Sequence, residues 1–142
     1  LLFVIILPVL LMNNNTEVSL GWLDIIGMIV WIFGFYFEAV GDAQLARFVK
    51  DPAHKGKLMQ SGLWAYTRHP NYFGEVVQWW GVWLITLSSM IGWFSIIGPL
   101  TITFLILKVS GIPMLEKKME KNPEFIEYKR KVNMFFPLPP KD

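Results

Sequence analysis

Ionisable side chains gather in the stretch Gly62–Glu75, at the edge of an otherwise apolar sequence. Arg68 and His69 stand directly before Pro70, a residue that suits the first turn of a helix because its missing N–H costs nothing there. The start of a helix presents unpaired N–H groups and the positive end of a dipole, so it attracts anions. Together with Lys57 across the preceding loop, these residues predict a site for a phosphate or a carboxylate.

A polar stripe follows on the helix that begins at this point. Asn71, Glu75 and Gln78 are spaced by four and three residues, which places them on one side of the helix. Such groups are strongly unfavourable against lipid, so we expect the stripe to face other helices or a cavity. It would orient a bound cofactor, or it would serve only as a hydrogen-bond network between helices.

Two further carboxylates, Glu38 and Asp42, lie four residues apart on the preceding apolar segment and therefore on one helix face. Carboxylates in or beside the hydrocarbon usually point into the bundle or a wet cavity. The alternative is that both are solvated among the lipid headgroups.

Other chemistries find little support in the sequence. The chain has no cysteine, and its two histidines, His54 and His69, lack the spacing of a metal site, so no metal is predicted. The serines have no obvious base partner for nucleophilic catalysis. No glycine-rich fingerprint of a soluble dinucleotide enzyme is present, and no nucleic acid is expected as a partner. No catalytic residue is assigned.

The composition indicates which elements hold these residues. Hydrophobic residues make up 54% of the 142 positions and charged residues only 17%, which predicts an integral membrane protein whose direct partner is the bilayer. All 13 lysines and arginines lie between Arg47 and Arg68 or between Lys108 and Lys141. The positive-inside rule therefore places loop 47–69 and the C-terminal tail in the cytoplasm, with no distinction between a bacterial inner membrane and the endoplasmic reticulum.

The fold class predicted is all-α, a polytopic bundle of about four transmembrane helices in one domain, residues 1–142. Leu1–Met12 is too short to span a bilayer and is interpreted as a truncated first helix, the chain being the C-terminal part of a longer one. Further helices are predicted at Trp22–Val40, from His69 to Ser88 and at Trp93–Ser110. One helix over the uncharged run from Val76 to Leu107 would extend about 48 Å, so a turn is placed near Ser88.

Smaller features refine this prediction. Gly27, Gly34 and Gly41 recur every seven residues and mark a helix-packing face. Asp51-Pro52 predicts a helix stop, and Pro99 predicts a kink.

The tail, residues 113–142, is predicted to be cytoplasmic and amphipathic. It should form one or two short helices broken at Asn122-Pro123, followed by an extended end. Its apolar side is drawn from the following residues: Leu115, Met119, Phe125, Ile126 and Val132.

The residues of Gly62–Glu75, and above all the core Asn71-Tyr72-Phe73-Gly74-Glu75, resemble the signature of the steroid 5α-reductase-like family, particularly its bacterial members. The resemblance extends back to Phe37–Asp42 and forward to Leu115–Lys118. It implies an NADPH-dependent reduction of a conjugated carbon-carbon double bond in a steroid-like or other lipophilic substrate. Helices before Leu1, or a partner chain, would complete the bundle and supply the catalytic acid.

The resemblance also implies a set of cofactor contacts. Asn71 and Glu75 would contact the cofactor, with Asp42 as an acidic partner. Lys57 stands where the steroid reductases have a phosphate-binding arginine. Lys50, or Arg47, would stand for another cation. The remaining members of the predicted cofactor site are Arg68, His69, Tyr72 and Glu116, while Tyr128 and Arg130 correspond only loosely.

Two other functions remain open at this stage. Isoprenylcysteine carboxyl and phospholipid methyltransferases share the spacing Arg68-His69-Pro70 with a following tyrosine, and in them the site would hold S-adenosylmethionine. That family usually has an apolar residue in place of Asn71. The third possibility is a membrane module without catalytic activity.

Overall fold

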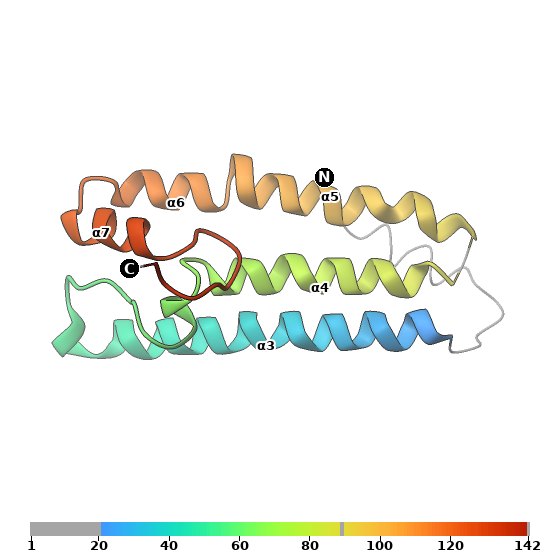
Figure 1. Cartoon of the computed structure of the whole chain (residues 1–142), viewed down its shortest axis with the longest axis horizontal. Helices are drawn as coiled ribbons and strands as arrows, with labels where there is room; N and C mark the ends of the chain where they lie inside the picture. Colours follow the sequence, from blue (N-terminus) through green and yellow to red (C-terminus); the bar gives the residue numbers. More distant parts are fainter. Residues whose placement is uncertain (1–20, 89, 142) are drawn as a thin grey trace.

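The computed structural model describes residues 21–88 and 90–141, and most of this part of the chain is helical. Its only β-type pairing is one parallel bridge between Thr67 and Asn133. Figure 1 shows α3, α4 and the line formed by α5 and α6 running side by side, with α7 folded back at one end. The α-helices are α3 (Trp22–Lys50), α4 (Pro70–Thr86), α5 (Ile97–Phe104), α6 (Ile112–Met119) and α7 (Pro123–Lys131). The predicted all-α class is confirmed, whereas the predicted helix at Leu1–Met12 lies outside the described residues.

Helix α3 is longer than predicted. It continues for 29 residues, past Val40 to Lys50, and ends where Asp51 adopts an extended conformation before Pro52. The predicted stop is confirmed, because the residue before a proline is driven away from the helical region. The predicted end at Val40 was wrong, because Gly41 lies inside the helix at a close approach to α4.

A seam of glycines joins α3 to α4. A Cβ atom on Gly34 would lie 2.7 Å from the carbonyl oxygen of Gly74, and one on Gly27 would lie 2.7 Å from that of Gly81. At Gly41 the nearest atoms are the backbone nitrogen of Asn71 and the ring of Pro70. The predicted packing face is thus confirmed, and small residues on both helices let the backbones touch.

The segment after α4 is less regular than predicted. In place of one helix from Trp93 to Ser110, a 3₁₀ segment (Met90–Ile96) leads into α5, and a π-helical turn (Leu105–Val109) follows. Pro99 is the third residue of α5, which continues the 3₁₀ segment without a break, and the predicted kink at Pro99 stays a prediction. The π-helical turn is a second irregularity of this segment, after the 3₁₀ stretch. It lies shortly before Gly111, the residue that precedes α6.

Two segments, Trp22–Lys50 and Gly92–Met119, are long and apolar enough to cross a membrane, which is consistent with the predicted helical membrane protein. Between them lies α4 with 17 residues, close to the predicted span from His69 to Ser88. The number of membrane crossings and their orientation stay predictions.

The tail forms two helices separated at Asn122-Pro123, as predicted, with the Asn122 side chain accepting from the backbone N–H of Glu124. Phe125 and Val132 are buried, but Ile126 is 58% exposed and Leu115 is 40% exposed, so the predicted apolar side was wrong for these two. Two short 3₁₀ turns, Pro52–His54 and Gly62–Ala65, complete the loop between α3 and α4.

Candidate functional site

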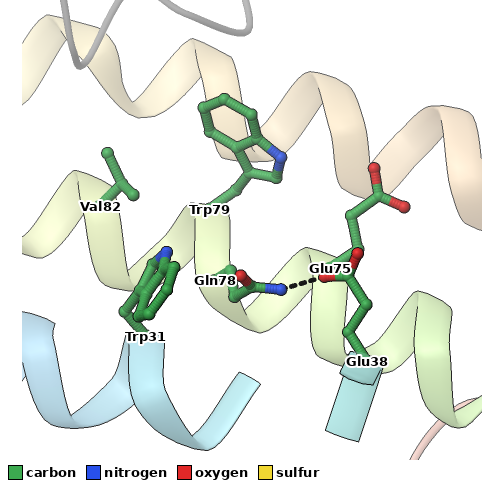
Figure 2. Close-up of a pocket in the computed structure, with 6 residues that line it drawn as sticks. All are labelled: Trp31, Glu38, Glu75, Gln78, Trp79 and Val82. Atoms are coloured by element: carbon green, nitrogen blue, oxygen red, sulfur yellow. Dashed lines mark hydrogen bonds between the residues drawn. The ribbon is translucent and has the colours of Figure 1, made fainter. Parts of the chain in front are cut away.

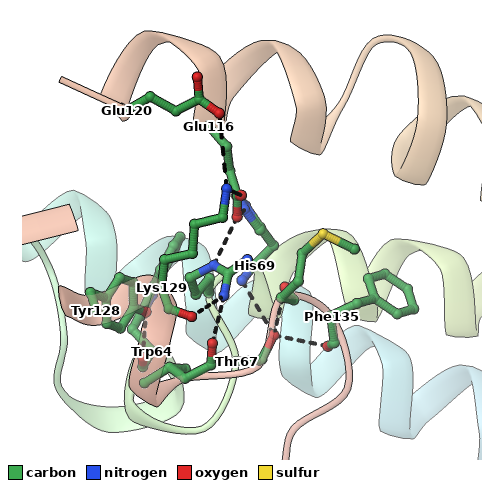
Figure 3. A network of polar contacts seen from close by, with 11 residues as sticks. Trp64, Thr67, His69, Glu116, Glu120, Tyr128, Lys129 and Phe135 are labelled. Atoms are coloured by element: carbon green, nitrogen blue, oxygen red, sulfur yellow. Dashed lines mark hydrogen bonds and ion pairs between the residues drawn. The ribbon is translucent and has the colours of Figure 1, made fainter. Parts of the chain in front are cut away.

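A buried ion cluster connects the start of α4 with α6 and α7. Glu116 of α6 accepts from Nε of Arg68 at 2.8 Å, and its same oxygen lies 3.1 Å from Nε2 of His69. The second oxygen lies 3.5 Å from Nζ of Lys129 on α7. Arg68, His69 and Glu116 are each less than a tenth exposed. Figure 3 shows the side chains of His69 and Lys129 directed toward the Glu116 carboxylate.

The same arginine also holds the end of α7. Its Nη1 donates to the carbonyl oxygens of Lys129 at 3.1 Å and Val132 at 2.6 Å. These carbonyls belong to the last turn of α7 and the residue after it, where helical partners are missing. The guanidinium therefore closes this helix end as well as pairing with Glu116.

The C-terminal tail lies along the loop before α4. The Arg68 backbone N–H donates to the Asn133 carbonyl at 2.9 Å, and that of Leu138 donates to the Tyr66 carbonyl at 3.1 Å. The hydroxyl of Thr67, which is fully buried, donates to the Phe135 carbonyl at 2.8 Å. The chain bends at residues 132 and 134–136, and the Lys141 N–H donates to the Lys131 carbonyl at 2.8 Å, so the tail turns back to α7 and is not extended throughout as predicted. It is hydrogen-bonded to the bundle.

A tryptophan joins three segments beneath this tail. The indole N–H of Trp64 donates to the Gly41 carbonyl of α3 at 3.1 Å, and the phenol of Tyr128 on α7 donates to the Trp64 carbonyl. Burial raises the pKa of the Tyr128 phenol, against the opposing effect of nearby Arg68. The phenol therefore remains a hydrogen-bond donor at neutral pH.

A cavity of about 260 Å³ lies among these elements, at the end of the molecule where α7 folds back. Its walls come from the end of α3, the loop before α4, and helices α6 and α7. Most of the lining is apolar, with Lys57 as its exposed cation. The polar side chains on its wall are those of Lys57, Arg68, His69, Asn71 and Tyr128.

Asn71 has a buried polar atom whose bonding is incomplete, and it is one of the residues on this wall. Its Nδ2 donates to Oδ1 of Asp42 at 2.9 Å, so the structure brings this predicted pair together across α3 and α4. The amide oxygen is buried and has no hydrogen-bond partner among the described residues. Buried acceptors are normally satisfied, so Asn71 brings an unsatisfied acceptor to a position that lines the first cavity.

A second cavity, of about 300 Å³, lies one helical turn further along the α3–α4 seam. Figure 2 shows Glu38, Glu75 and Gln78 on it, flanked by Trp31 and Trp79. The Gln78 amide donates to the Glu38 carboxylate. The polar stripe therefore faces α3 and a cavity, as predicted.

The predicted site residues fall into three groups. Asp42, Asn71 and Glu75 share the seam, whereas Arg68, His69 and Glu116 form the ion cluster, with the Tyr72 ring centroid 5.8 Å from that of His69. Lys57 is exposed at the first cavity and Lys50 is exposed at the end of α3. The backbone nitrogen of Asn71 faces α3 at Gly41, so the start of α4 is covered there and not open as the predicted anion site requires.

Trp64 and Thr67 belong to this site and were not predicted from the sequence. Both lie within Gly62–Glu75, but their roles depend on partners far along the chain, namely Gly41, Phe135 and Tyr128. The described residues contain no group of three or more side chains that could hold a metal ion.

Comparisons with known proteins identify relatives of this chain. The steroid 5-alpha-reductase DET2 of Arabidopsis thaliana is 35% identical over 74 residues, which are 51% of this chain and 28% of that protein. The 3-oxo-5-alpha-steroid 4-dehydrogenase 1 of Bos taurus is 37% identical over 68 residues, which are 47% of this chain and 26% of that protein. These matches thus span little more than a quarter of each relative. No solved structure matches the chain significantly.

A family model described as "Protein of unknown function (DUF1295)" matches residues 1–132. The predicted resemblance to steroid 5α-reductases is confirmed by the curated relatives, which come from plants and cattle, while the predicted tie to bacterial members stays a prediction. The chain is similar to the steroid 5-alpha-reductases, and it belongs to the DUF1295 family.

Proposed function

We propose that this chain forms the cofactor-binding part of a membrane-embedded, NADPH-dependent reductase. It would reduce a conjugated carbon-carbon double bond in a steroid-like or other lipophilic substrate. The names of the relatives support the reaction class. The observation that carries the proposal is that Asn71, which lines the first cavity, has a buried amide oxygen without a hydrogen-bond partner among the described residues.

The residues present fit part of NADPH. The carboxamide of a nicotinamide ring carries an N–H₂ group, and the Asn71 oxygen is an acceptor whose own amide nitrogen is fixed by Asp42. Lys57, exposed at the same cavity, would hold a phosphate as a point charge. When bound, NADPH would supply the hydride for the reduction.

Arg68, His69 and Glu116 fit a phosphate less well. The polar atoms of these three residues named above already bond within the chain. We therefore infer that they shape the cavity, and that exposed cations such as Lys57 and Lys50 meet the phosphates. Glu75, one turn beyond Asn71, would orient the reactive end of the cofactor from the second cavity.

The residue that polarises the substrate is not assigned in this chain. The matched part is little more than a quarter of the reductases, so we propose that segments outside it, or a partner chain, complete the substrate site. The substrate would be lipophilic because the site adjoins helices apolar enough to span a membrane.

Calorimetry on the detergent-purified full-length protein tests the proposal. NADPH should bind with a Kd well below millimolar, and S-adenosylmethionine should bind negligibly. The reverse ranking would replace the reductase by a methyltransferase. If neither ligand binds, a membrane module without catalytic activity becomes the better interpretation.

Three variants separate cofactor contact from packing. Asn71→Ala and Glu75→Gln should raise the NADPH Kd by roughly tenfold, the loss of about one good hydrogen bond each. Gln78→Ala should leave this Kd within about twofold and lower the melting temperature, because it removes the donor to Glu38. Equal loss of folding in all three would reduce the stripe to a packing role.

A further inference from the structure

The ion cluster of Arg68, His69, Glu116 and Lys129 connects α6 and α7 to the residues just before α4. Glu116 binds two consecutive residues, Arg68 and His69, through a single oxygen. His69 is the residue before α4, and Asn71 stands in the first turn of that helix. The carboxylate therefore fixes the backbone that delivers the Asn71 side chain to the first cavity.

The cluster also fixes the opposite wall of that cavity. Through Lys129 and through Arg68, it holds α7 and the residues after it. From there, backbone bonds tie residues 133–138 to the loop at 66–68. One carboxylate thus connects α6, α7, the tail and the start of α4.

Because this cluster is buried, breaking it should cost more free energy than breaking an exposed ion pair. Removing one partner of a buried ion pair leaves an uncompensated charge, which is far more costly than breaking an exposed pair. Glu127 offers a contrast, since it pairs with Arg130 and Lys131 on the exposed side of α7. The two glutamates are chemically alike and differ in burial and in what they connect.

We propose that Glu116 is the positioning residue of a clamp: it holds the C-terminal segment 132–138 against loop 66–69 and so sets the place of Asn71 in the first cavity. Glu116 does this without touching the cofactor. The part of the inference that concerns cofactor affinity rests on the proposed function. The clamp itself depends only on contacts within the chain.

The test compares Glu116→Gln with Glu127→Gln in the full-length protein, by amide hydrogen exchange and by NADPH calorimetry. Glu116→Gln should speed exchange of the Arg68 and Leu138 amides by at least about tenfold, because both donate across the loop–tail pairing. Amides inside α4, such as that of Val77, should keep their rates, which separates local release from unfolding. Glu127→Gln should change neither set.

NADPH binding supplies the second readout. Glu116→Gln should raise the NADPH Kd about tenfold, and Arg68→Lys, which keeps the charge but loses the planar fork, should raise it to a similar extent. Faster exchange with an unchanged Kd would overturn the positioning role. Unchanged exchange at Arg68 and Leu138 would overturn the clamp itself. If the wild-type protein binds no NADPH, the proposed function fails, and the exchange result alone then decides the clamp.

Discussion

At the scale of residues, the site depends on side chains that each join segments distant in the sequence. Trp64 connects the middle of α3 to the last helix through its indole N–H and its carbonyl oxygen. The Tyr128 phenol is 64 positions further along the chain than the carbonyl that accepts from it. A single hydroxyl therefore contributes to holding α7 in place.

Tyr128→Phe should lower the free energy of unfolding by about 1 kcal/mol at neutral pH, the usual net value of a hydrogen bond. The pKa of this phenol is raised in the folded state, so the folded protein keeps a proton that the unfolded chain releases above about pH 10. The wild-type stability should then fall as the pH rises above 10, and the difference from the Phe variant should shrink.

Denaturant unfolding of the purified protein at pH 7 and above pH 10 provides the measurement. Tyr66→Phe is the matched control, since Tyr66 is 49% exposed. A stability loss as large for Tyr66→Phe as for Tyr128→Phe would contradict the assigned bond.

At the scale of elements, α3 and α4 are held together by backbone contact. An Ala in a helix usually stabilises it over Gly by roughly 0.5–1 kcal/mol. At Gly74 the expected sign is reversed, because an added Cβ would lie 2.5 Å from the carbonyl oxygen of Gly34.

Gly74→Ala should therefore lower stability by about 1–3 kcal/mol, the typical cost of overpacking. Thermal unfolding in detergent measures this, with Gly21→Ala as the control. A Cβ on Gly21 would meet its nearest atom, an oxygen of Asp24, at an ordinary 3.5 Å. A melting temperature for Gly74→Ala at or above that of the wild type would show that the two backbones are not in contact there.

These two scales also show what the sequence could predict. The seam was predictable because Gly27, Gly34 and Gly41 repeat with a helical period, and such a repeat is a local property. The stop at Asp51-Pro52 was predictable for a local reason too, whereas the continuation of α3 through Gly41 depends on contact with Pro70 and Asn71 of α4. Likewise, Arg68 and His69 have the composition of an anion site, and only the folding of α6 beside them shows that Glu116 already supplies the anion.

At the scale of the whole molecule, charge is distributed unevenly along the chain. The lysines and arginines lie in two regions, both on the side where the positive-inside rule predicts the cytoplasm. In Figure 1 the loop after α3 and helix α7 lie at the same end of the bundle, which is the end that holds the first cavity. The predicted cofactor site would thus open to the cytoplasm.

Cysteine labelling tests this orientation. The chain contains no cysteine, so only an introduced cysteine within it can react. In sealed vesicles of known orientation, Lys55→Cys and Lys121→Cys should react with a membrane-impermeant maleimide from the cytoplasmic side. Ser88→Cys, at the other end of α4, should react from the opposite side. All three positions are exposed. Labelling of all three from one side would contradict the predicted crossing by α4.

The pairing of loop 66–68 with the tail also sets an order of assembly during synthesis. The partner of Arg68 is Glu116, which is synthesised 48 residues later, and the partner of Thr67 is Phe135, which is synthesised 68 residues later. Helices α3 and α4 come from neighbouring parts of the chain and can pair through their glycines well before that. The first cavity needs α6 and α7 as walls, so it can form only after this pair, and a ribosome that stalls before α6 would leave a paired α3–α4 hairpin without it.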